Sequence, residues 1–427
     1  MRNHYIHIKA LLILFVSIIQ NCSIISALSQ KCSIHNAQDC SQLKPLANFW
    51  NVPTKDVPKL LHLEEKLITI DSILQPLLNG SYFGGTYIDI KVGQININTI
   101  DPSKEYEVRN SSKLRNYLNY LNFKVANNTL FQLNSTFNQI FKFSQNFTTT
   151  NCMFSIEPKD NNVVVYLNKD DPKNNRFIEK IENLDPKPII KPFPEEVENE
   201  IIFNSSTLIE KRQLYLYVVG GSKIAAFFEN RVKTCSAGFW VKKDDEDYVA
   251  TAGHCARNIP PIPTFYLINR NYLIGKMEDY VFERNDVGFI SKDGDEITLK
   301  PILRNKFYME PTQYLLYYIV DSSDITSRGI HVCKSGYATG FTCGEVLAFD
   351  TVYKFDSGKI VNNAITVQLI GNSGDSGGSL YRYHDGDNPS LFVDAVGLYI
   401  GGTFNVGAAE PIDKIFDFGY DLVTLLD

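Results

Sequence analysis

Gly374-Asp375-Ser376-Gly377-Gly378 is the stretch from which the fold and the function of this chain are inferred. A serine between an acid and a glycine pair is a candidate nucleophile on a tight turn, because glycine bends sharply and keeps side chains away from an incoming carbonyl group. The amides of Gly374 and Ser376 can then point at one spot, where an oxyanion would develop. A glycine-rich turn can also be only a turn, so this stretch alone does not decide between a loop and a site.

Two further segments supply the partners that a serine nucleophile needs. Residues 251–255, Thr-Ala-Gly-His-Cys, contain His254, and residues 285–288, Asn-Asp-Val-Gly, contain Asp286. A lone histidine is more often structural than catalytic, but His254 occurs together with an acid and a candidate nucleophile. We therefore interpret His254, Asp286 and Ser376 as a catalytic triad.

The composition indicates a globular chain whose two halves differ in charge. Its 427 residues suit two or three domains, and 44% of them are hydrophobic and 21% charged. The net charge is −6, which gives no reason to expect a nucleic-acid partner. Residues 213–427 carry a net charge of −8 and residues 1–212 a net charge of +2.

The N-terminus has the pattern of a targeting segment. An apolar run from Ala10 to Ile19 follows Arg2 and Lys9, and it is too short to cross a bilayer. The alternative is an uncleaved anchor, but two polar residues interrupt the run after Ile19. We expect a signal peptide over residues 1–29, and a soluble, secreted mature protein without membrane attachment.

The cysteines fit an oxidising compartment. The C-terminal half holds an even set that can pair internally: Cys235, Cys255, Cys333 and Cys343. In the N-terminal half Cys32, Cys40 and Cys152 cannot all pair within the mature chain, and their pairing stays open. None of the cysteines has zinc-type spacing with histidine, so neither a metal site nor a cofactor is predicted.

Asn-x-Ser/Thr sequons divide the chain at the same place. None follows residue 212, and outside the signal segment they begin at Asn79, Asn110, Asn127, Asn134, Asn146 and Asn204. Glycans need exposed loops in a secreted chain. Chance in an Asn-rich region is the alternative, but the pattern favours a glycosylated first half and a bare second half.

Residues 30–185 are predicted to form an α+β domain without catalytic residues. Residues 59–78 have the pattern of an amphipathic helix. Residues 86–99 alternate like paired strands, and residues 161–167 form a Val-rich strand. The polar stretch over residues 108–150 is predicted to be helical in part.

A linker is predicted over residues 186–212. It contains four prolines and an acidic run, and it ends at the dibasic pair Lys211-Arg212. Such a pair is a candidate processing site, although most dibasic pairs are only surface charge. The mature N-terminus would lie directly after Arg212 or a few residues later.

From residue 213 the chain is predicted to be all-β. Short runs rich in Val, Tyr and Phe alternate with Gly and Asp turns, which is typical of a sandwich or barrel. Predicted strands cover residues 235–241, 248–252, 287–290, 315–320, 364–369 and 393–400. Residues 411–426 are predicted to form a C-terminal helix.

Residues 213–427 resemble a chymotrypsin-fold serine protease of the bacterial-type branch that includes α-lytic protease and the streptogrisins. The order His, Asp, Ser is that of the chymotrypsin arrangement. The resemblance is carried by residues 235–239, 251–255, 374–378, 396–402 and, most specifically, the Cys-to-Cys segment 333–344. Residues 84–89 and 162–165 resemble strands of that branch's pro-region more weakly.

The resemblance implies two six-stranded β-barrels with the site between them, and two disulfides, Cys235–Cys255 and Cys333–Cys343. It implies that Ile400, Gly401 and Gly402 pair with a protein or peptide substrate as an extra strand, beside Tyr399. It also implies that the pro-region acts first as a folding aid and then as an inhibitor. We expect a monomer.

The chain departs from that branch at three places. Ile400 replaces a serine that contacts the triad aspartate in relatives, which should weaken activity modestly. Ile370 and Val406 replace a third disulfide, with an apolar contact as the expected substitute. Lys334 stands where relatives carry an arginine, so we expect a Lys334–Asp375 ion pair; an exposed Lys334 is the alternative.

The substrate preference and the second function class follow from the same residues. The resemblance implies a specificity pocket with residues 370–373 at its base and Tyr399 and Gly402 as walls. None of these residues is acidic, so the pocket should take apolar or aromatic substrate residues rather than basic ones. The leading hypothesis is a secreted serine endopeptidase made as a proenzyme. The alternative is a catalytically silent homologue that binds a protein partner through the same cleft.

Overall fold

The computed structural model describes residues 41–193 and 216–427, apart from residues 230, 260–261, 268–271, 305–315, 387–390 and 404. Four sequence predictions lie outside the described residues: the signal peptide, the Lys211-Arg212 pair, Cys32 with Cys40, and the sequon at Asn204. Across the part of the chain that the structure describes, no helix combines the length and the apolar character that a membrane span requires.

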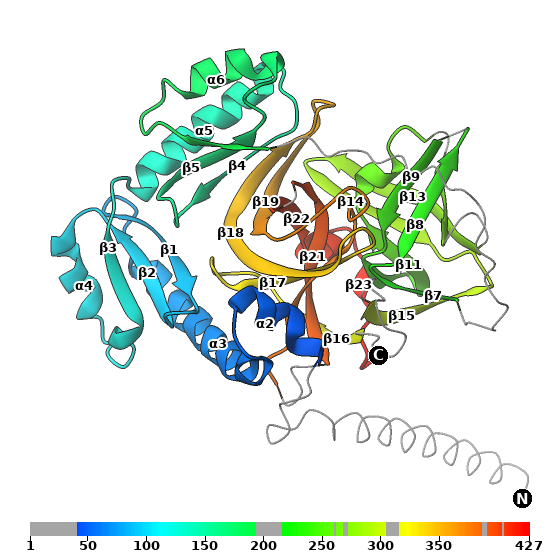
Figure 1. The fold of residues 1–427 in the computed structure, drawn as a ribbon, viewed down its shortest axis with the longest axis horizontal. Coiled ribbons are helices and arrows are strands. Elements are labelled where there is room, and N and C mark those ends of the chain that lie inside the picture. The colour runs from blue at the N-terminus through cyan, green and yellow to red at the C-terminus, as the bar shows by residue number, and fades with distance from the viewer. Residues whose placement is uncertain are drawn as a thin grey trace, which may run out of the picture.

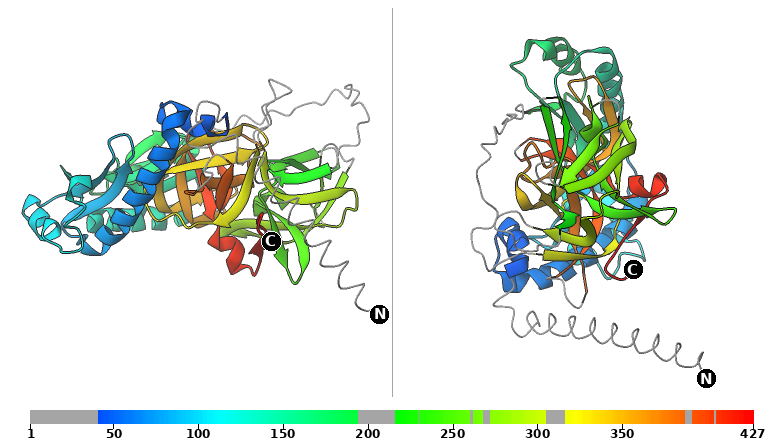
Figure 2. Two further views of the ribbon diagram at one scale, coloured as in Figure 1. Left: turned by 90° about the horizontal axis from the view of Figure 1, so that it is seen from below. Right: turned by 90° about the vertical axis from the view of Figure 1, so that its right-hand side faces the viewer.

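The molecule consists of three parts in a row, as Figures 1 and 2 show. The N-terminal part forms one end, a twelve-stranded sheet forms the middle, and an eight-stranded sheet forms the other end. The N-terminal part contains a three-stranded sheet in the order β1-β2-β3, where β2 is antiparallel to β1 and parallel to β3. Its strands are β1 (Phe83–Asp89), β2 (Gln94–Thr99) and β3 (Leu121–Val125).

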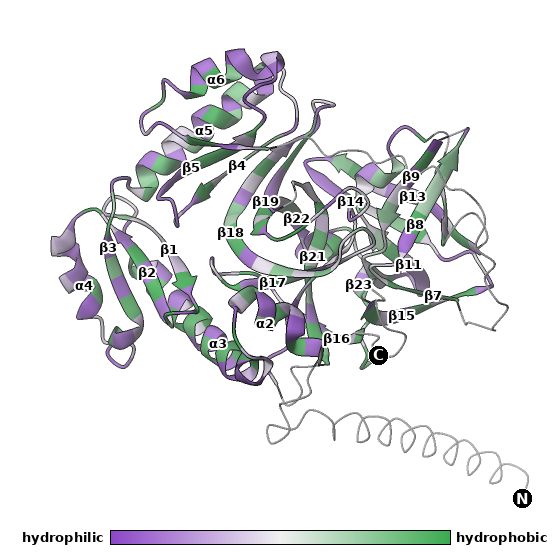
Figure 3. Cartoon of the chain, in the orientation of Figure 1, coloured by the Kyte–Doolittle hydropathy of each residue, from purple (hydrophilic) through white to green (hydrophobic). Residues whose placement is uncertain are grey.

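Helix α3 (Val57–Leu74) accompanies this sheet and confirms the helix predicted over residues 59–78. It buries one face, with Leu61, Leu67 and Ile70 at most 2% exposed. Figure 3 shows the hydrophobic and hydrophilic residues alternating along it, as expected of a helix with one buried face. The helices nearby are α2 (Lys44–Trp50) and α4 (Glu105–Arg109).

A second layer of the N-terminal half joins the middle sheet directly. Strand β4 (Cys152–Glu157) pairs antiparallel with β18 (Gly340–Lys354) through three residue pairs. Helix α5 (Leu130–Asn146) begins at a capping box formed by Thr129 and Gln132. The remaining elements of this layer are β5 (Asn162–Leu167), β6 (Ile189–Pro192) and α6 (Asn175–Ile181).

The eight-stranded sheet has the order β23-β10-β11-β14-β13-β12-β8-β9. Its strands are β8 (Lys223–Phe228), β9 (Arg231–Ser236), β10 (Phe239–Lys243), β11 (Glu246–Thr251), β12 (Thr264–Leu267), β13 (Tyr272–Glu283), β14 (Asn285–Ser291) and β23 (Asp421–Leu422). A buried core with Ile224, Phe265 and Ile290 lies inside it.

The twelve-stranded sheet has the order β6-β5-β4-β18-β17-β20-β21-β16-β15-β7, with β19 and β22 off this path. The pairings run β17-β18-β19-β22-β21-β20 and return to β17, so six strands form a closed circuit. Its further strands are β7 (Leu216–Gly220), β15 (Ile297–Arg304), β16 (Leu316–Ser322), β17 (His331–Gly336), β19 (Ile360–Gln368), β20 (Ser379–Tyr383), β21 (Phe392–Gly402) and β22 (Gly407–Pro411).

The predicted C-terminal helix over residues 411–426 is mostly wrong. Helix α7 covers only Asp413–Asp417, and the chain then returns to the eight-stranded sheet as β23. Gly419 adopts a positive φ of 77°, which ends the helical path and turns the chain. The apolar residues that follow the turn pack through strand pairing with Val241 and Lys242 instead of along a helix.

Two further predictions differ from the structure in detail. The single strand predicted over residues 235–241 is two strands, β9 and β10, interrupted at Gly238. A Cβ atom on Gly238 would lie 2.8 Å from the carbonyl oxygens of Ala250 and Gly377, so the backbone passes too closely for a side chain. Strand β6 lies within the predicted linker and pairs in parallel with β5.

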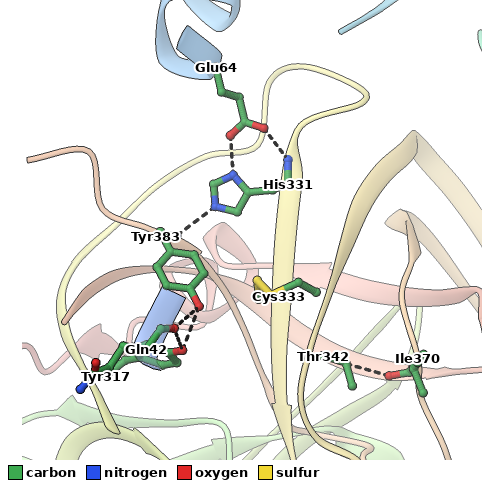
Figure 4. The surroundings of a disulfide bond; sticks show 9 residues. Gln42, Glu64, Tyr317, His331, Cys333, Thr342, Ile370 and Tyr383 are labelled. Atoms are coloured by element: carbon green, nitrogen blue, oxygen red, sulfur yellow. Dashed lines mark hydrogen bonds and ion pairs between the residues drawn. A yellow bond between two sulfur atoms is a disulfide. The ribbon is translucent and has the colours of Figure 1, made fainter. Parts of the chain in front are cut away.

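Buried polar side chains tie the N-terminal half to the middle sheet (Figure 4). Glu64 of α3 accepts hydrogen bonds from the ring and the backbone amide of His331 in β17, and an ion pair from Arg382 at 2.8 Å. Tyr383 donates its hydroxyl proton to the carbonyl of Gln42 at 2.9 Å. Glu64 and His331 are fully buried, so the two halves share one packed interface.

Candidate active site

The three predicted triad residues lie on two different sheets. His254 follows β11 in a short 3-10 turn, Gly253–Ala256, and Asp286 lies in β14, so both belong to the eight-stranded sheet. Ser376 lies in the loop between β19 and β20 of the twelve-stranded sheet. The site is therefore assembled where the two sheets meet.

Asp286 orients His254 through two hydrogen bonds. The ring Nδ1 of His254 lies 2.6 Å from Asp286 Oδ2, and the backbone amide of His254 donates to Asp286 Oδ1 at 2.7 Å. Asp286 is fully buried and His254 is 9% exposed. With Nδ1 held by a carboxylate, the other ring nitrogen, Nε2, is the one left to accept a proton.

Two aromatic rings flank His254. The rings of Phe282 in β13 and of Phe355 after β18 each lie 5.8 Å from the imidazole, and 4.8 Å from each other. The two phenylalanines come from different sheets and pack against each other beside the imidazole. The sequence analysis did not identify them, since nothing local to either residue points to the histidine.

The turn around Ser376 is fixed by close backbone contacts to the histidine segment. The carbonyl of Ser376 accepts from the amide of Ser236 at 2.8 Å. Gly377 has a φ of 81°, and a Cβ atom there would lie 2.7 Å from the carbonyl oxygen of Ser236 and 2.8 Å from the amide nitrogen of Ala252. Glycine is thus required for the nucleophile turn to approach the residues just before His254.

Ser376 is partly buried, and among the described residues its hydroxyl has no hydrogen-bond partner. Ser376 and His254 both lie in the described part of the chain, and no hydrogen bond joins Ser376 Oγ to the His254 ring. Catalytic hydrogen bonds are often long without substrate and tighten only in the complex. The structure brings the Ser376 turn against Ala252, two residues before His254.

The amides of Gly374 and Ser376 are available for a ligand. Within the described residues neither amide donates to a protein group, whereas the neighbouring amides of Asp375, Gly377 and Gly378 all do. The carbonyl of Gly374 accepts from Ser236 Oγ at 2.7 Å, which holds the peptide plane, and Gly374 has a φ of 97°. Two fixed, unused donors side by side are suited to an oxyanion.

The structure places Lys334 against Asp375, the residue before the candidate nucleophile. Lys334 Nζ lies 2.9 Å from Asp375 Oδ2, and both side chains are fully buried. Burial lowers the pKa of Lys334, and the adjacent carboxylate opposes that change. The run Val218–Gly221 superficially resembles the N-terminus that trypsin-type enzymes free on activation, but no basic residue directly precedes Val218. The structure places Val218 within strand β7, paired with Leu299.

Two disulfides support the site. Cys235–Cys255 joins the end of β9 to the turn that carries His254, and Cys333–Cys343 links β17 to β18. Cys152 is a buried free thiol, and burial raises its pKa to about 12. Among the described residues the one cluster of three potential metal ligands is Cys235, His254 and Cys255, and the disulfide removes both thiolates from it.

Glu410 in β22 is a site residue that the sequence analysis missed. Its Oε1 accepts the backbone N–H of Asp286 at 2.6 Å, and its Oε2 is buried without a hydrogen-bond partner among the described residues. Burial, together with the nearby charge of Asp286, raises the pKa of Glu410 to about 8. The only sequence signal is an acid in the apolar run Gly407–Ile412, which does not reveal a partner 124 residues away.

The predicted substrate strand lies beside the nucleophile turn. Tyr399 in β21 donates its N–H to the carbonyl of Gly378 at 2.9 Å and accepts from the amide of Gly377 at 2.7 Å. Gly401 and Gly402 follow and pair only with β22, so among the described strands their other edge is unpaired. Ile400 is 1% exposed and packs in the core that includes Ala252.

The residues predicted to replace a third disulfide do not share one buried contact. Val406 is 7% exposed and belongs to a core, whereas Ile370 is 42% exposed. The structure gives Ile370 a different role, because its carbonyl accepts from Thr342 Oγ1 at 2.8 Å, as Figure 4 shows. The sequons that the structure describes all have exposed asparagines: Asn79, Asn110, Asn127, Asn134 and Asn146.

The curated relatives that match part of the chain are named as streptogrisins and as a serine protease, all from Streptomyces. No protein-family model matches the chain. It is 34% identical over 169 residues to Streptogrisin-D of Streptomyces griseus, which covers 40% of this chain and 38% of that protein. It is 29% identical over 192 residues to Serine protease 2 of Streptomyces fradiae, which covers 44% of this chain and 96% of that protein.

Streptogrisin-C of Streptomyces griseus is 26% identical over 205 residues, covering 47% of this chain and 40% of that protein. The chain thus spans about two fifths of the length of the two streptogrisins. Among solved structures, Thermobifida fusca Protease A is 24% identical with a TM-score of 0.39, and covers 49% of this chain and 99% of that one. By sequence, the chain is therefore similar to the bacterial-type serine proteases of the chymotrypsin fold.

Proposed function

We propose that this chain is a secreted serine endopeptidase made as a proenzyme. The observation that carries the proposal is the arrangement at Ser376: two unused amides beside a serine, with a carboxylate-bound histidine across the sheet junction. Sequence similarity to Streptogrisin-D supports the same reaction class. The substrate is then a protein or peptide, and no cofactor takes part.

Each residue of the proposed triad has one task. Ser376 Oγ attacks the peptide carbonyl carbon, and His254 Nε2 takes the hydroxyl proton and later gives it to the leaving amine. Asp286 holds the imidazole and favours the imidazolium, and the amides of Gly374 and Ser376 bind the oxyanion. In the second half of the reaction, His254 takes a proton from water, the water attacks the acyl carbon, and Ser376 Oγ leaves with that proton. One oxyanion donor is worth about 3 kcal/mol of transition-state stabilisation.

The fold assignment that goes with this function is two six-stranded barrels. The closed circuit of β17 to β22 would be the second barrel, and the β8–β14 strands would be the first, with β9 and β10 acting as one bent strand. Ile400, Gly401 and Gly402 would add the substrate as a further strand, because the edge of β21 is unpaired there. Apolar or aromatic residues are expected before the scissile bond, since residues 370–373 contain no acid.

The N-terminal half is proposed to be the pro-region, over residues 30–185 and followed by the linker to residue 212. Its docking on β17 and β18 supports a role as folding aid and then inhibitor. Secretion, glycosylation of the exposed asparagines and a monomeric product belong to the same proposal.

Labelling with a fluorophosphonate tests the function directly. The processed protein should react at Ser376, and Ser376→Ala should abolish both labelling and peptide-ester turnover. Loss of the histidine in His254→Ala should reduce turnover about as much, because triad members act as a unit. Ser357→Ala, an exposed serine on the β18–β19 turn, serves as the matched control. Unlabelled processed protein that still binds a protein partner would favour the silent homologue.

A further inference from the structure

Two glycines face the ring of Tyr399 next to the nucleophile turn. A Cβ atom on Gly371 would lie 2.7 Å from Tyr399 Cζ, and one on Gly407 would lie 2.5 Å from Cε2 and 2.6 Å from Oη. Real Cβ atoms do not approach other heavy atoms so closely. The ring therefore occupies the space between residue 371, ahead of the nucleophile, and the start of β22.

The backbone fixes Tyr399 in this position. Its N–H and carbonyl both bond to the Gly377-Gly378 turn, and the residue is 1% exposed. On the other side of the ring, Lys334 Nζ lies 5.4 Å from the ring centroid. Because Lys334 is itself held by Asp375, the ring is confined on several sides and cannot swing away without disturbing the nucleophile turn.

A substrate bound along the free edge at Gly401-Gly402 brings its own side chain to the same space. Its scissile carbonyl must lie near Ser376 Oγ and the two free amides. In the proposed substrate pose, the side chain just before that bond would enter the space between residue 371 and the β21–β22 hairpin, which the Tyr399 ring occupies. A large side chain and the Tyr399 ring cannot both fit there.

We propose that Tyr399 determines the specificity of the protease by filling the pocket for the residue before the scissile bond, so that glycine and alanine are accepted there and aromatic residues are rejected. This rests on the proposed peptidase activity. It keeps the apolar preference stated for that activity, restricts it to small side chains, and replaces the expectation that aromatic residues are accepted. Gly371 and Gly407 contribute by leaving room for the ring. Residues 370–373 contain no acid that would attract a basic side chain.

The test compares peptide substrates that differ only in this residue: alanine, leucine, phenylalanine and arginine. For the processed wild-type protein, kcat/KM should be at least tenfold higher with alanine than with phenylalanine, the scale at which an apolar pocket discriminates by size. Tyr399→Ala should raise the phenylalanine-to-alanine ratio at least tenfold. Tyr399→Phe keeps the ring and should keep the wild-type order.

The ratio of two substrates on one protein sample does not depend on the fraction of folded enzyme, so partial unfolding of Tyr399→Ala does not mask the result. Wild-type preference for phenylalanine or arginine, or an unchanged ratio in Tyr399→Ala, would overturn the inference and leave the peptidase function standing. Protein that neither reacts with fluorophosphonate nor cleaves any of the four peptides would overturn the proposed function and this inference with it.

Discussion

Lys334 and Asp375 form a fully buried ion pair directly before the candidate nucleophile, with Nζ 2.9 Å from Oδ2. The carboxylate also accepts the amides of Ala338, Thr339 and Asn372 at 2.8–3.0 Å, and the Thr339 hydroxyl at 2.7 Å. Five donors thus hold one side chain, and that side chain determines the path of residues 372–376. The ion pair links the hairpin β17–β18 to the proposed oxyanion turn.

Replacing the cation should therefore disturb both stability and turnover. Lys334→Met leaves a buried carboxylate without its counter-charge, which should lower the free energy of unfolding by about 3 kcal/mol and remove most activity. Urea unfolding and fluorophosphonate labelling measure the two effects. Lys276→Met, an exposed lysine on β13, is the control and should change stability by less than about 0.5 kcal/mol.

Because Asp375 is already paired with Lys334, we predict that activity does not need a free N-terminus at Val218. Val218 lies within β7, so extra residues ahead of it should cost little activity. Activity that requires a free amine on Val218 would contradict this and would indicate a trypsin-type switch.

Glu410 should make stability depend on pH in a defined window. Its pKa is about 8 in the folded protein, against an ordinary value of 4.5. Between these values the unfolded chain has lost the proton that the folded chain keeps, so this group's contribution to stability falls as pH rises, by about 1.4 kcal/mol per pH unit, and is flat above pH 8.

Glu410→Gln removes this proton but keeps an oxygen to accept the Asp286 amide. The variant should therefore gain stability relative to wild type as pH rises from 5 to 8, measured by urea unfolding at each pH. Asp413→Asn, an exposed acid three residues away, should track the wild type. Parallel wild-type and Glu410→Gln curves over this range would show that Glu410 ionises normally.

Part of this candidate site could be predicted from sequence because short local motifs contain its residues. Gly374–Gly378 and the segment around His254 carry their chemistry in consecutive residues, and the structure places both at one sheet junction. Short runs rich in Val, Tyr and Phe between Gly and Asp turns likewise revealed the strands around residues 248–252 and 393–400, where the structure has β11 and β21.

Other features depend on strand register and on contacts between residues far apart in the sequence, and no local sequence pattern predicts these. Glu410 meets Asp286 only because β22 packs against β14, and Glu64 meets His331 across 267 residues. The prediction of a C-terminal helix was wrong because a local pattern was present but distant pairing overrode it. Its apolar spacing is compatible with a helix, but Gly419 and pairing with β10 draw the chain into a sheet.

Glu64 and Glu65 offer a matched pair for testing the interface between the halves. Glu64 is fully buried and bonds to both His331 and Arg382, whereas the side chain of Glu65 is 35% exposed and contacts only Arg382 among these. In the full chain Glu64→Gln should lower the free energy of unfolding by about 3 kcal/mol. Glu65→Gln removes the same charge one residue away and should lower it by about 1 kcal/mol or less. Equal losses in urea unfolding would mean that burial of Glu64 does not matter.

The last prediction concerns folding of the C-terminal half alone. Its strands pair over long sequence separations, and such topologies fold slowly. Without the N-terminal half, β18 loses its partner β4, and His331 loses both Glu64 and the edge contact of the Trp50 ring at 5.6 Å. We predict that residues 213–427 expressed alone stay inactive, and that adding residues 30–212 as a separate chain restores peptide-ester turnover.

Trp50 provides a graded form of this test. It is 2% exposed against the middle sheet, so Trp50→Ala in the added chain should raise the concentration needed for half-maximal rescue at least tenfold. Phe131→Ala is the control, because Phe131 is 73% exposed and its loss should leave the rescue curve in place. Efficient unaided folding of residues 213–427 would refute the prediction, since the interface would then contribute nothing that the second half cannot supply itself. Equal rescue by Trp50→Ala and Phe131→Ala would instead place the assisting contacts at β4 rather than at α2, because β4 carries the other buried junction with β18.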